Sequence, residues 1–538
     1  MPKIVVADRI SERGLALLRE TGWPVAVPPA AELARELADA AGLIVRSATR
    51  VNSELLEKAA ALRVVGRAGV GVDNIDVEAA TRRGVLVMNT PGGNAVSVAE
   101  HALALLLALA RNVPQLAAAT RAGRWEKSGA QGIEVRGKTL GLVGLGRVGG
   151  EVARRARAME MRVLASDPFL SENAARDAGA ELVSLDDLLA RADFISLHTA
   201  LSPATEKIIN AAALGKMKRG ARLINTARGE LVDEAALAEA LRSGHLAGAA
   251  LDVFAVEPPR DSPLLALPNV IATPHVAGST EEAQEEVGTL IAQQVRDYLV
   301  EGMLRNAVNL PALSAEQYSR VRPYLVLGER LGSLVAQVAA GGVGRVRIAY
   351  AGEPAEIGTH VVRNAVLAGI LNTALEEKVN LVNAAGVAAA RGLAVEEHTR
   401  RREQGFPNTI EVTSLPGGGE RPLSVEGTVL WGTTPRILSI DGMPLEAPLE
   451  GTILFTRNRD VPGVIGQMGS VLGSQGINIA TFDLGRAPQR PAAPGAQNEE
   501  RAPEALALIG LDGAVPDSIL QAIRGIAAVI EARIVRLP

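Results

Sequence analysis

The sequence has no cysteine, few aromatic residues and no excess of positive charge. Without cysteine the chain cannot form disulfides, thiolate nucleophiles or cysteine-based zinc and iron–sulfur sites. Only 3 Trp, 4 Tyr and 6 Phe occur among 538 residues, which argues against a platform for stacking nucleic-acid bases. The 56 Lys and Arg are outnumbered by 60 Asp and Glu, so nothing in the overall charge favours a nucleic-acid or membrane partner.

No segment has the length of a membrane span or the pattern of a signal peptide. The longest apolar run, Ala102 to Ala110, is far shorter than the roughly 20 residues that span a bilayer, and a charged Arg111 ends it. This run favours a buried helix. The first apolar segment, Ile4 to Ala7, ends at Asp8 and predicts a β-strand rather than a leader. We therefore expect a soluble, cytoplasmic protein.

The length predicts three or four domains, at about 150 residues each. Short apolar runs alternate with helical stretches over residues 1–95 and again over 138–276, which is typical of parallel α/β sheets. A helical pattern follows from Glu281 to Tyr298, and Asn309-Leu310-Pro311 marks a boundary.

The C-terminal third has a different pattern. Residues 315–450 are rich in Val, Ala and Gly, with a turn cluster at 416–419. From Gly451 the predicted order is strand, helix, strand, strand, helix, strand, which is the ferredoxin-like order. Residues 486–503 contain four prolines and few large apolar residues, so we expect a surface loop there.

Three glycines form a dinucleotide-binding motif. Gly144, Gly146 and Gly149 follow an apolar strand and precede a helix, where they permit a tight turn and close approach to a pyrophosphate. Asp167 lies 18 residues beyond Gly149 and can accept hydrogen bonds from both ribose hydroxyls. Neither Pro168 nor the next residue can receive a 2′-phosphate, so the motif favours NAD over NADP. A tight turn without a ligand is the alternative.

A second group of polar residues follows later strands of the same region. Oxidation of a 2-hydroxy acid by hydride transfer needs a cation that holds the carboxylate and a base that takes the hydroxyl proton. Arg228, within Asn225–Gly229, supplies a bidentate fork, and His275 supplies an imidazole, the side chain that most often acts as a general base. Glu257 fits the carboxylate that fixes the imidazole ring.

The segment Met217–Gly229 resembles the most specific signature of the D-isomer-specific 2-hydroxyacid dehydrogenases, and the resemblance covers residues 1 to about 310. It implies catalytic roles for Arg228, Glu257 and His275. It also implies an α/β fold with two doubly wound parallel-sheet domains: a flavodoxin-like substrate domain (1–97 plus 283–312) and a Rossmann NAD domain (98–282). The residues it implies for NAD are Gly144, Gly146, Arg147, Val148, Gly149, Asp167, Pro168, His198, Thr199, Thr226, Ala227, Arg228, Asp252, His275, Ala277 and Gly278.

Three parts of the substrate domain carry a closer resemblance: residues 46–49, the glycine-rich segment 66–76 around Arg67, and Asn94. Within that family they resemble motifs of the phosphoglycerate dehydrogenase branch. Arg46 and Arg67 lie at strand-to-loop transitions, where two guanidiniums can hold a dianionic phosphate. Pairing with local acids is the alternative. The substrate-binding residues that the resemblance implies are Arg46, Ser47, Arg67, Asn94, Arg228 and His275.

The C-terminal units resemble two further domains of the long form of this branch. Residues 315–450 resemble its α+β intervening domain, and residues 451–538 resemble a ferredoxin-like ACT regulatory domain, mainly through Asp460–Val464 and Gly476–Ala480. The resemblance implies an amino-acid effector, with serine as the candidate, held by Asn458, Asp460 and Asn478. Because Asn458 stands where relatives often carry His or Tyr, we expect weak serine binding or another effector.

The sequence thus predicts an NAD-dependent oxidoreductase, without metal, that converts 3-phospho-D-glycerate to 3-phosphooxypyruvate in the first step of phosphorylated L-serine biosynthesis. The resemblance implies a homodimer or homotetramer. Three alternatives stay open. The protein is another D-2-hydroxyacid dehydrogenase of the glyoxylate or hydroxypyruvate reductase type, a non-enzymatic NAD sensor like the C-terminal binding protein corepressors, or an amino-acid sensor that carries a relic enzyme.

Overall fold

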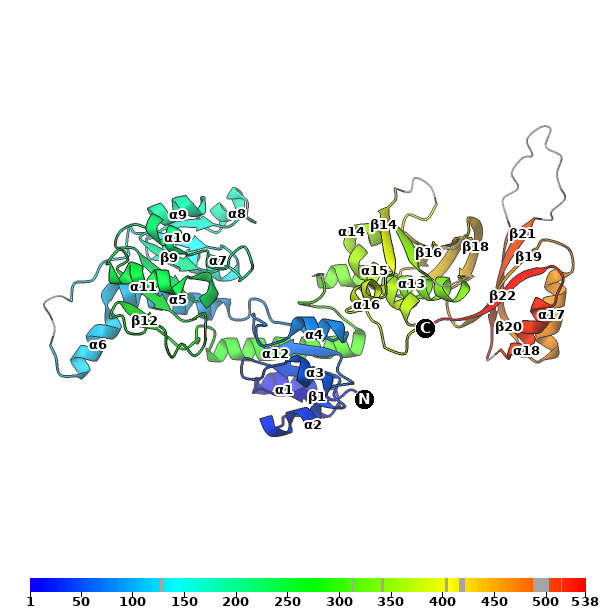
Figure 1. Cartoon of the computed structure of the whole chain (residues 1–538), viewed down its shortest axis with the longest axis horizontal. Coiled ribbons are helices and arrows are strands. Elements are labelled where there is room, and N and C mark those ends of the chain that lie inside the picture. Colours follow the sequence, from blue (N-terminus) through cyan, green and yellow to red (C-terminus); the bar gives the residue numbers. More distant parts are fainter. Residues whose placement is uncertain are drawn as a thin grey trace, which may run out of the picture.

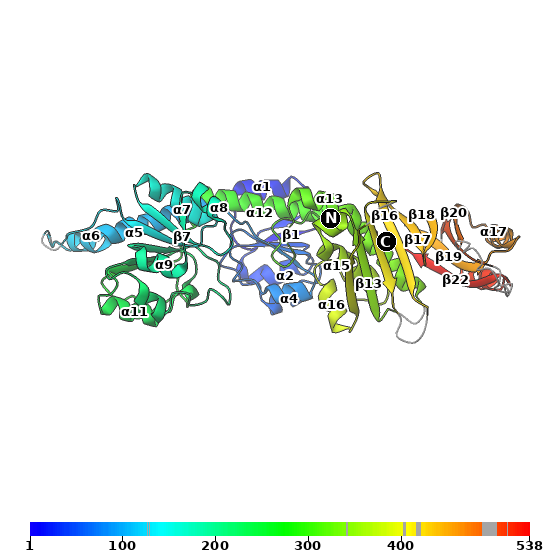
Figure 2. The ribbon, with the colours of Figure 1, turned by 90° about the horizontal axis from the view of Figure 1, so that it is seen from above.

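Four β-sheets lie in a row along an elongated molecule, in which the first sheet of the chain stands between the second and the third (Figures 1 and 2). The computed structural model describes residues 1–125, 127, 130–311, 313–339, 343–401, 405–415, 421–486, 503–513 and 515–538. The expected turn cluster at 416–419 and the interior of the expected loop at 486–503 lie outside these residues.

The first sheet is parallel throughout, in the order β2-β1-β3-β4-β5. This is the flavodoxin-like order, so the prediction of the fold is confirmed here. Its strands are β1 (Ile4–Val6), β2 (Val25–Ala26), β3 (Gly42–Val45), β4 (Val64–Arg67) and β5 (Leu86–Met88), and its helices are α1 (Glu12–Arg19), α2 (Leu33–Leu37), α3 (Ser53–Glu57) and α4 (Val77–Arg82).

A long helix, α12 (Glu281–Glu301), returns the chain from the second sheet to the first (Figure 1). Its Ile291 and Val295 are fully buried in one core cluster with residues of β1 and β3. The helix approaches α1 closely, since a Cβ on Gly14 would lie 2.6 Å from the carbonyl oxygen of Gly288. Two glycines at this crossing therefore let the two helix backbones touch.

The second sheet has seven parallel strands in the Rossmann order, β12-β11-β10-β9-β6-β7-β8. The order reverses between β6 and β9, which places a ligand crevice at the carboxyl ends of these strands. The strands are β6 (Thr139–Val143), β7 (Arg162–Ser166), β8 (Glu181–Leu182), β9 (Phe194–Leu197), β10 (Arg222–Asn225), β11 (Gly248–Leu251) and β12 (Val270–Ala272). The helices are α5 (Ala95–Arg111), α6 (Val113–Arg121), α7 (Arg147–Ala158), α8 (Glu172–Asp177), α9 (Leu185–Arg191), α10 (Ala211–Lys216) and α11 (Glu234–Arg242).

The third sheet is mixed, with order β14-β13-β15-β16-β17-β18 and one parallel pair, β13 and β14. The strands are β13 (Arg345–Ala351), β14 (Ala394–Thr399), β15 (Thr409–Ser414), β16 (Leu423–Leu430), β17 (Thr434–Ile440) and β18 (Met443–Pro448). The helices are α13 (Ala315–Val338), α14 (Glu353–Ile357), α15 (Thr359–Leu371) and α16 (Ala384–Ala390). This is the α+β unit that the sequence predicts.

The fourth sheet has the antiparallel order β20-β21-β19-β22, which is the ferredoxin-like arrangement. Its elements are β19 (Thr452–Arg459), α17 (Val464–Ser474), β20 (Ile479–Arg486), β21 (Glu504–Leu511), α18 (Asp517–Arg524) and β22 (Val529–Arg536). Leu454 and Ile509 face a core formed with the two helices, whereas Ile453 and Phe455 belong to the core of the third unit. Both faces of this sheet are therefore covered.

Polar contacts reinforce the boundary between the third and fourth units. Nη2 of Arg457 lies 2.6 Å from Oδ2 of Asp441, and both side chains are less than a tenth exposed. Gln337, on α13, accepts from the backbone N–H of Arg536 at 2.9 Å and donates to its carbonyl at 2.8 Å. One core cluster runs from the first sheet through α12 and α13 to the fourth sheet, while the second sheet has two clusters of its own.

In the part of the chain that the structure describes, no single helix is long and apolar enough to cross a membrane. Helices α5 and α6 pass that test only as a pair, and a bend of 66° separates them. Asn112, between them, has a left-handed backbone with φ of 53°.

Candidate active site

Each of the three motif positions is a glycine for a different structural reason. Gly144 has φ of +94°, and a Cβ there would lie 2.8 Å from the carbonyl oxygen of His198. A Cβ on Gly149 would overlap the carbonyl oxygen of Gly144, so this glycine lets α7 pack on the turn. A Cβ on Gly146 would meet no atom within 4 Å. The backbone of Gly146, the N-cap of α7, is thus open to an approaching anion, as a dinucleotide pyrophosphate requires.

Asp167, just beyond β7, closes the other side of this turn. Its Oδ2 accepts from the N–H of Leu145 at 3.0 Å, and its Oδ1 accepts from the N–H of Phe169 at 3.0 Å. Each carboxylate oxygen keeps a lone pair for a further donor. The arrangement fits an acceptor for ribose hydroxyls beside the pyrophosphate position.

The ends of β9 and β10 supply further polar groups to the same crevice. His198 and Thr199 follow β9, and Nε2 of His198 lies 2.9 Å from Oγ of Ser196. Burial lowers the pKa of His198 to about 4, so its ring is neutral at pH 7. Thr226, which follows β10, is buried, and its Oγ1 has no hydrogen-bond partner among the described residues. Since buried hydroxyls are nearly always paired, the Thr226 hydroxyl indicates a missing ligand, and the crevice fits NAD.

Asp252 is fully buried and organises the loop that carries His275. Its Oδ1 accepts from the Thr273 hydroxyl at 2.6 Å and from the N–H of Val276 at 3.0 Å, while Oδ2 accepts from the N–H of Ala277 at 2.8 Å. Burial alone would raise the pKa of Asp252, but hydrogen bonds, that of His101 first, outweigh it and hold the pKa below its ordinary value. The contacts of Asp252 within the chain are thus those of a positioning residue.

His275 and Glu257 form the pair that acid–base chemistry requires. Nδ1 of His275 lies 2.9 Å from Oε2 of Glu257, and Oε1 of Glu257 accepts from the N–H of Phe254 at 3.2 Å. The backbone of His275 is left-handed, with φ of 52°, and its N–H donates to the carbonyl of Asp252 at 2.8 Å. When Nδ1 donates to the carboxylate, Nε2 is free to accept a proton from a ligand.

Arg228 follows β10 and reaches toward the first unit. The Asn225 side chain holds its loop by donating to the carbonyl of Arg228 at 2.7 Å and accepting from the N–H of Ala227 at 3.0 Å. Nη2 of Arg228 lies 3.2 Å from Oδ2 of Asp73. A Cβ on Gly71 would overlap this guanidinium, so only glycine permits the approach. Arg228 therefore bridges the two units.

Three guanidiniums gather where the first and second units meet. Burial, and next the positive charge of Arg228, lower the pKa of Arg67; Asp73 opposes this, and Arg46 adds to it. Nε of Arg67 is buried and has no partner among the described residues. A group of like charges with an unpaired buried donor has the chemistry that suits an anionic ligand.

The loop that carries Arg46 is fixed by two residues that the sequence analysis does not assign to the site. Asp8 accepts from the N–H of Arg46 at 2.6 Å and from the Thr49 hydroxyl at 2.7 Å. Asn74 donates from Nδ2 to the carbonyls of the same two residues at 2.7 and 2.6 Å. Ser47 lies exposed in this loop. The signal for Asn74 is its place in the glycine-rich segment of Arg67; Asp8 gives none beyond its position at a strand end.

Two other contacts involve α5 or the residue just before it: one joins the two units, and the other lies within the second unit. Nδ2 of Asn94, at the start of α5, would lie 2.6 Å from a Cβ on Gly278, so Asn94 packs on the turn after His275. Nε2 of His101, also on α5, lies 3.2 Å from Oγ1 of Thr273. His101 is a further residue that the sequence analysis misses.

The three predicted effector residues are not brought together within one chain. Asp460 follows β19 and lies 3.3 Å from Arg486, and its N–H donates to Pro503 at one end of β21. Asn478 lies at the other end of β21, where it donates to Asp512 at 2.6 Å. The eight residues of β21 span about 25 Å. Asn458 is buried in β19, and its Oδ1 has no partner within the described part of the chain.

Comparisons with known proteins find two matching sequence profiles and full-length relatives. The sequence profile of the "D-isomer specific 2-hydroxyacid dehydrogenase, NAD binding domain" matches residues 103–277, and that of the "D-3-phosphoglycerate dehydrogenase intervening domain" matches residues 320–441. D-3-phosphoglycerate dehydrogenase of Methanocaldococcus jannaschii is 41% identical over 540 residues, and that of Bacillus subtilis is 38% identical over 539 residues; each alignment covers 100% of both chains.

Solved structures match somewhat more than half of this chain. The TT0316 protein of Thermus thermophilus is 41% identical, with a TM-score of 0.52, and covers 57% of this chain and 99% of its own. A glyoxylate reductase of Paecilomyes thermophila is 32% identical, with a TM-score of 0.53, and covers 57% of this chain and 98% of its own. With relatives matched over the whole chain and an NAD-binding domain of the family type, the chain belongs to the D-3-phosphoglycerate dehydrogenases, a branch of the D-isomer-specific 2-hydroxyacid dehydrogenase family.

Proposed function

We propose that the protein oxidises 3-phospho-D-glycerate to 3-phosphooxypyruvate with NAD, as the first step of phosphorylated L-serine biosynthesis. The observation that carries this proposal is the group of three guanidiniums, Arg46, Arg67 and Arg228, at the junction of the two α/β units. A substrate with a carboxylate at one end and a phosphate at the other matches this distribution of charge. The full-length relatives support the same substrate.

In the mechanism we propose, Arg228 binds the carboxylate of the substrate, and Arg46 and Arg67 bind its phosphate. Nε2 of His275 accepts the proton of the C2 hydroxyl, and Glu257 stabilises the imidazolium that forms. NAD, when bound beside the Gly144–Gly149 turn, supplies the acceptor for the hydride that leaves C2. The positive charge of Arg228 stabilises the developing carbonyl group.

Steady-state turnover of 3-phospho-D-glycerate with NAD tests the proposal. His275→Gln should lower kcat by roughly 10²–10⁴-fold, the usual contribution of a positioned general base. His360→Gln, at an exposed position of the third unit, is the matched control. Faster turnover of glyoxylate or hydroxypyruvate would favour another 2-hydroxyacid dehydrogenase. NAD binding without turnover of any 2-hydroxy acid would favour a non-enzymatic sensor.

The proposed roles of Arg46 and Arg67 in binding the phosphate need a separate test. Arg46→Ala and Arg67→Ala should raise KM for 3-phospho-D-glycerate much more than KM for an unphosphorylated 2-hydroxy acid. Equal losses on both substrates would contradict a phosphate site at Arg46 and Arg67.

An amino-acid effector at the fourth unit is a further part of the proposal. Oγ1 of Thr456 and Oδ1 of Asn458 are buried without partners among the described residues, and both lie on the face of β19 that carries Leu454 and the α17 core. Unpaired acceptors there suit an ammonium or hydroxyl donor. Calorimetric titration with L-serine tests this for wild type and Asp460→Ala, and weak binding that the substitution removes is the expected result. Tight serine binding that survives Asp460→Ala would place the effector elsewhere.

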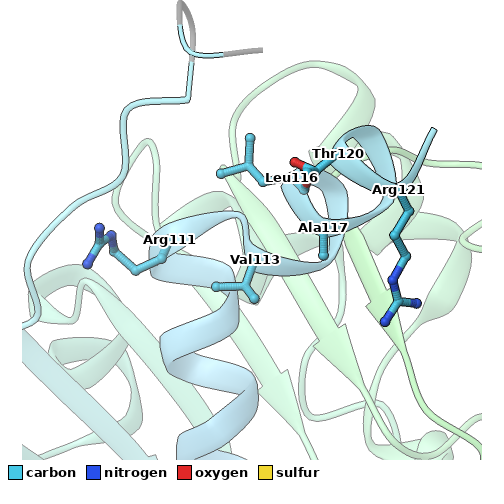
Figure 3. A pocket seen from close by; sticks show the side chains of 6 residues that line it. All are labelled: Arg111, Val113, Leu116, Ala117, Thr120 and Arg121. Atoms are coloured by element: carbon cyan, nitrogen blue, oxygen red, sulfur yellow. The ribbon is translucent and has the colours of Figure 1, made fainter. Parts of the chain in front are cut away.

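We propose that copies of the chain associate through α6. Figure 1 shows this helix projecting from the second unit. A hollow of about 660 Å³ lies along it, lined by the side chains that Figure 3 labels: Arg111, Val113, Leu116, Ala117, Thr120 and Arg121. Val113 and Trp125 are 52% and 83% exposed. An arm that exposes such side chains suits a second copy with the same arm. Leu116→Lys should reduce the mass measured by light scattering, and an unchanged mass would exclude this surface.

A cytoplasmic location remains part of the proposal.

A further inference from the structure

The guanidinium of Arg228 already has a carboxylate partner within the chain. Oδ2 of Asp73, in the first unit, lies 3.2 Å from Nη2 of Arg228, in the second. Both groups sit directly on the backbone of Gly71, where a Cβ would lie 2.6 Å from Oδ2 of Asp73 and would overlap the guanidinium. The contact between Asp73 and Arg228 is of the same kind as the one that Arg228 would form with the carboxylate of a 2-hydroxy acid.

The loop beside Asp73 is held in place by hydrogen bonds of Asn74, whereas the Asp73 side chain is largely exposed. The neighbouring Asn74 donates to the carbonyls of Arg46 and Thr49, and the carbonyl of Asn74 accepts from the N–H of Val51 at 2.9 Å. The Asp73 side chain is 69% exposed, and Arg228 is its ion-pair partner. Asp73 can therefore leave the guanidinium by turning its side chain, without a change in the loop.

We propose that the Asp73 carboxylate is paired with Arg228 before substrate binds, and that the carboxylate of the substrate then displaces it. This inference rests on the function proposed above. Asp73 is a positioning residue: it keeps Arg228 directed at Gly71 although Arg67, a like charge, lies nearby. Asp73 also makes the site selective. A ligand that displaces Asp73 breaks its ion pair with Arg228, and only a ligand with a carboxylate of its own forms an equivalent ion pair in return. When the product leaves, the ion pair between Asp73 and Arg228 forms again.

Asp73→Asn tests the exchange, since it removes the competing charge at constant shape. An exposed ion pair contributes at most about 1 kcal/mol, so KM for 3-phospho-D-glycerate should fall by up to about fivefold. The Kd of D-glycerate, which has only the carboxylate, should fall by a similar factor. The Kd of glycerol 3-phosphate, which has only the phosphate, should change much less. Asp73→Glu, which keeps the carboxylate, should move all three values back toward wild type.

The control is Asp76→Asn, which removes one negative charge nearby without touching Arg228. Asp76 caps α4 by accepting from the N–H of Ala79 at 2.9 Å, and Asn caps a helix equally well. KM should therefore stay at the wild-type value. A higher KM in Asp73→Asn, or equal tightening of all three ligands, would overturn the proposal. If wild type fails to oxidise 3-phospho-D-glycerate, the function proposed above fails, but the D-glycerate titration still tests Asp73.

Discussion

Arg457 joins the third and fourth units through a buried ion pair, and its replacement by Met has a large expected effect. The side chains of Arg457 and Asp441 are 9% and 8% exposed, and 2.6 Å separates their charged atoms. Met keeps most of the apolar stem but leaves the charge of the buried Asp441 carboxylate without a cation, although the N–H of Ser424 still donates to its Oδ1 at 2.9 Å. Removal of one member of such a pair costs about 3–5 kcal/mol. Glu504, the second acid on Arg457, keeps Arg421 at 3.2 Å, so its charge remains compensated.

Hydrogen exchange measured by mass spectrometry detects this loss locally. Amides of β17 and β19 should exchange about 10²–10⁴-fold faster in Arg457→Met, whereas those of β1 and β3 should not change. Asp441→Asn added to Arg457→Met removes the unpaired charge and should restore most of the protection. Acceleration of less than about fivefold in the single variant, the effect of an exposed pair, would refute the reasoning.

Three further predictions concern the second unit and its contacts. Gly146→Ala should weaken NAD binding about tenfold or more by calorimetry and leave the melting temperature almost unchanged, because its Cβ meets no protein atom within 4 Å. Gly71→Ala puts a Cβ on the Arg228 guanidinium, so it should lower kcat/KM about 10–100-fold in a steady-state assay while NAD still binds. His198, with its pKa lowered to about 4, binds its proton more readily in the unfolded chain. The free energy of unfolding should therefore decrease by up to about 3 kcal/mol as the pH falls from about 6.5 to 4, and urea titrations of His198→Gln should lack this decrease.

The sequence predicts the parallel sheets and the ligand-facing residues because their signals are local. An apolar strand followed by Gly144, Gly146 and Gly149 specifies a turn by itself. Arg228 and His275 follow strands of one parallel sheet, and the carboxyl ends of such strands meet at one edge. Their residue types alone then indicate the chemistry.

The supporting residues have no local signal. Asp8 holds the loop of Arg46 from 38 residues away, and His101 contacts Thr273 across 172 residues. Only the folded chain brings such partners together. The ion pair of Asp73 with Arg228 is of the same kind, since it joins two units that the sequence analysis treats separately.

The effector residues show a different limit. Asp460 and Asn478 both flank α17 in sequence, which suggests one pocket. The helix runs antiparallel to β19, so the two residues lie at opposite ends of the sheet. A single pocket that uses both needs a second copy of the chain to supply one of them.

The core cluster that runs from the first sheet to the fourth has a mechanical consequence. Asn380, in the third unit, donates to the carbonyl of Gly84 in the first at 2.8 Å, and Tyr318, on α13, donates to the carbonyl of Gly302, just after α12, at 2.6 Å. The first, third and fourth units thus share one continuous core, whereas the second unit has separate cores of its own. The chain passes between these two parts at the starts of α5 and α12. A displacement of the fourth sheet would therefore be passed through the shared core toward Arg46 and Arg67, whereas Arg228 and His275 belong to a unit with cores of its own.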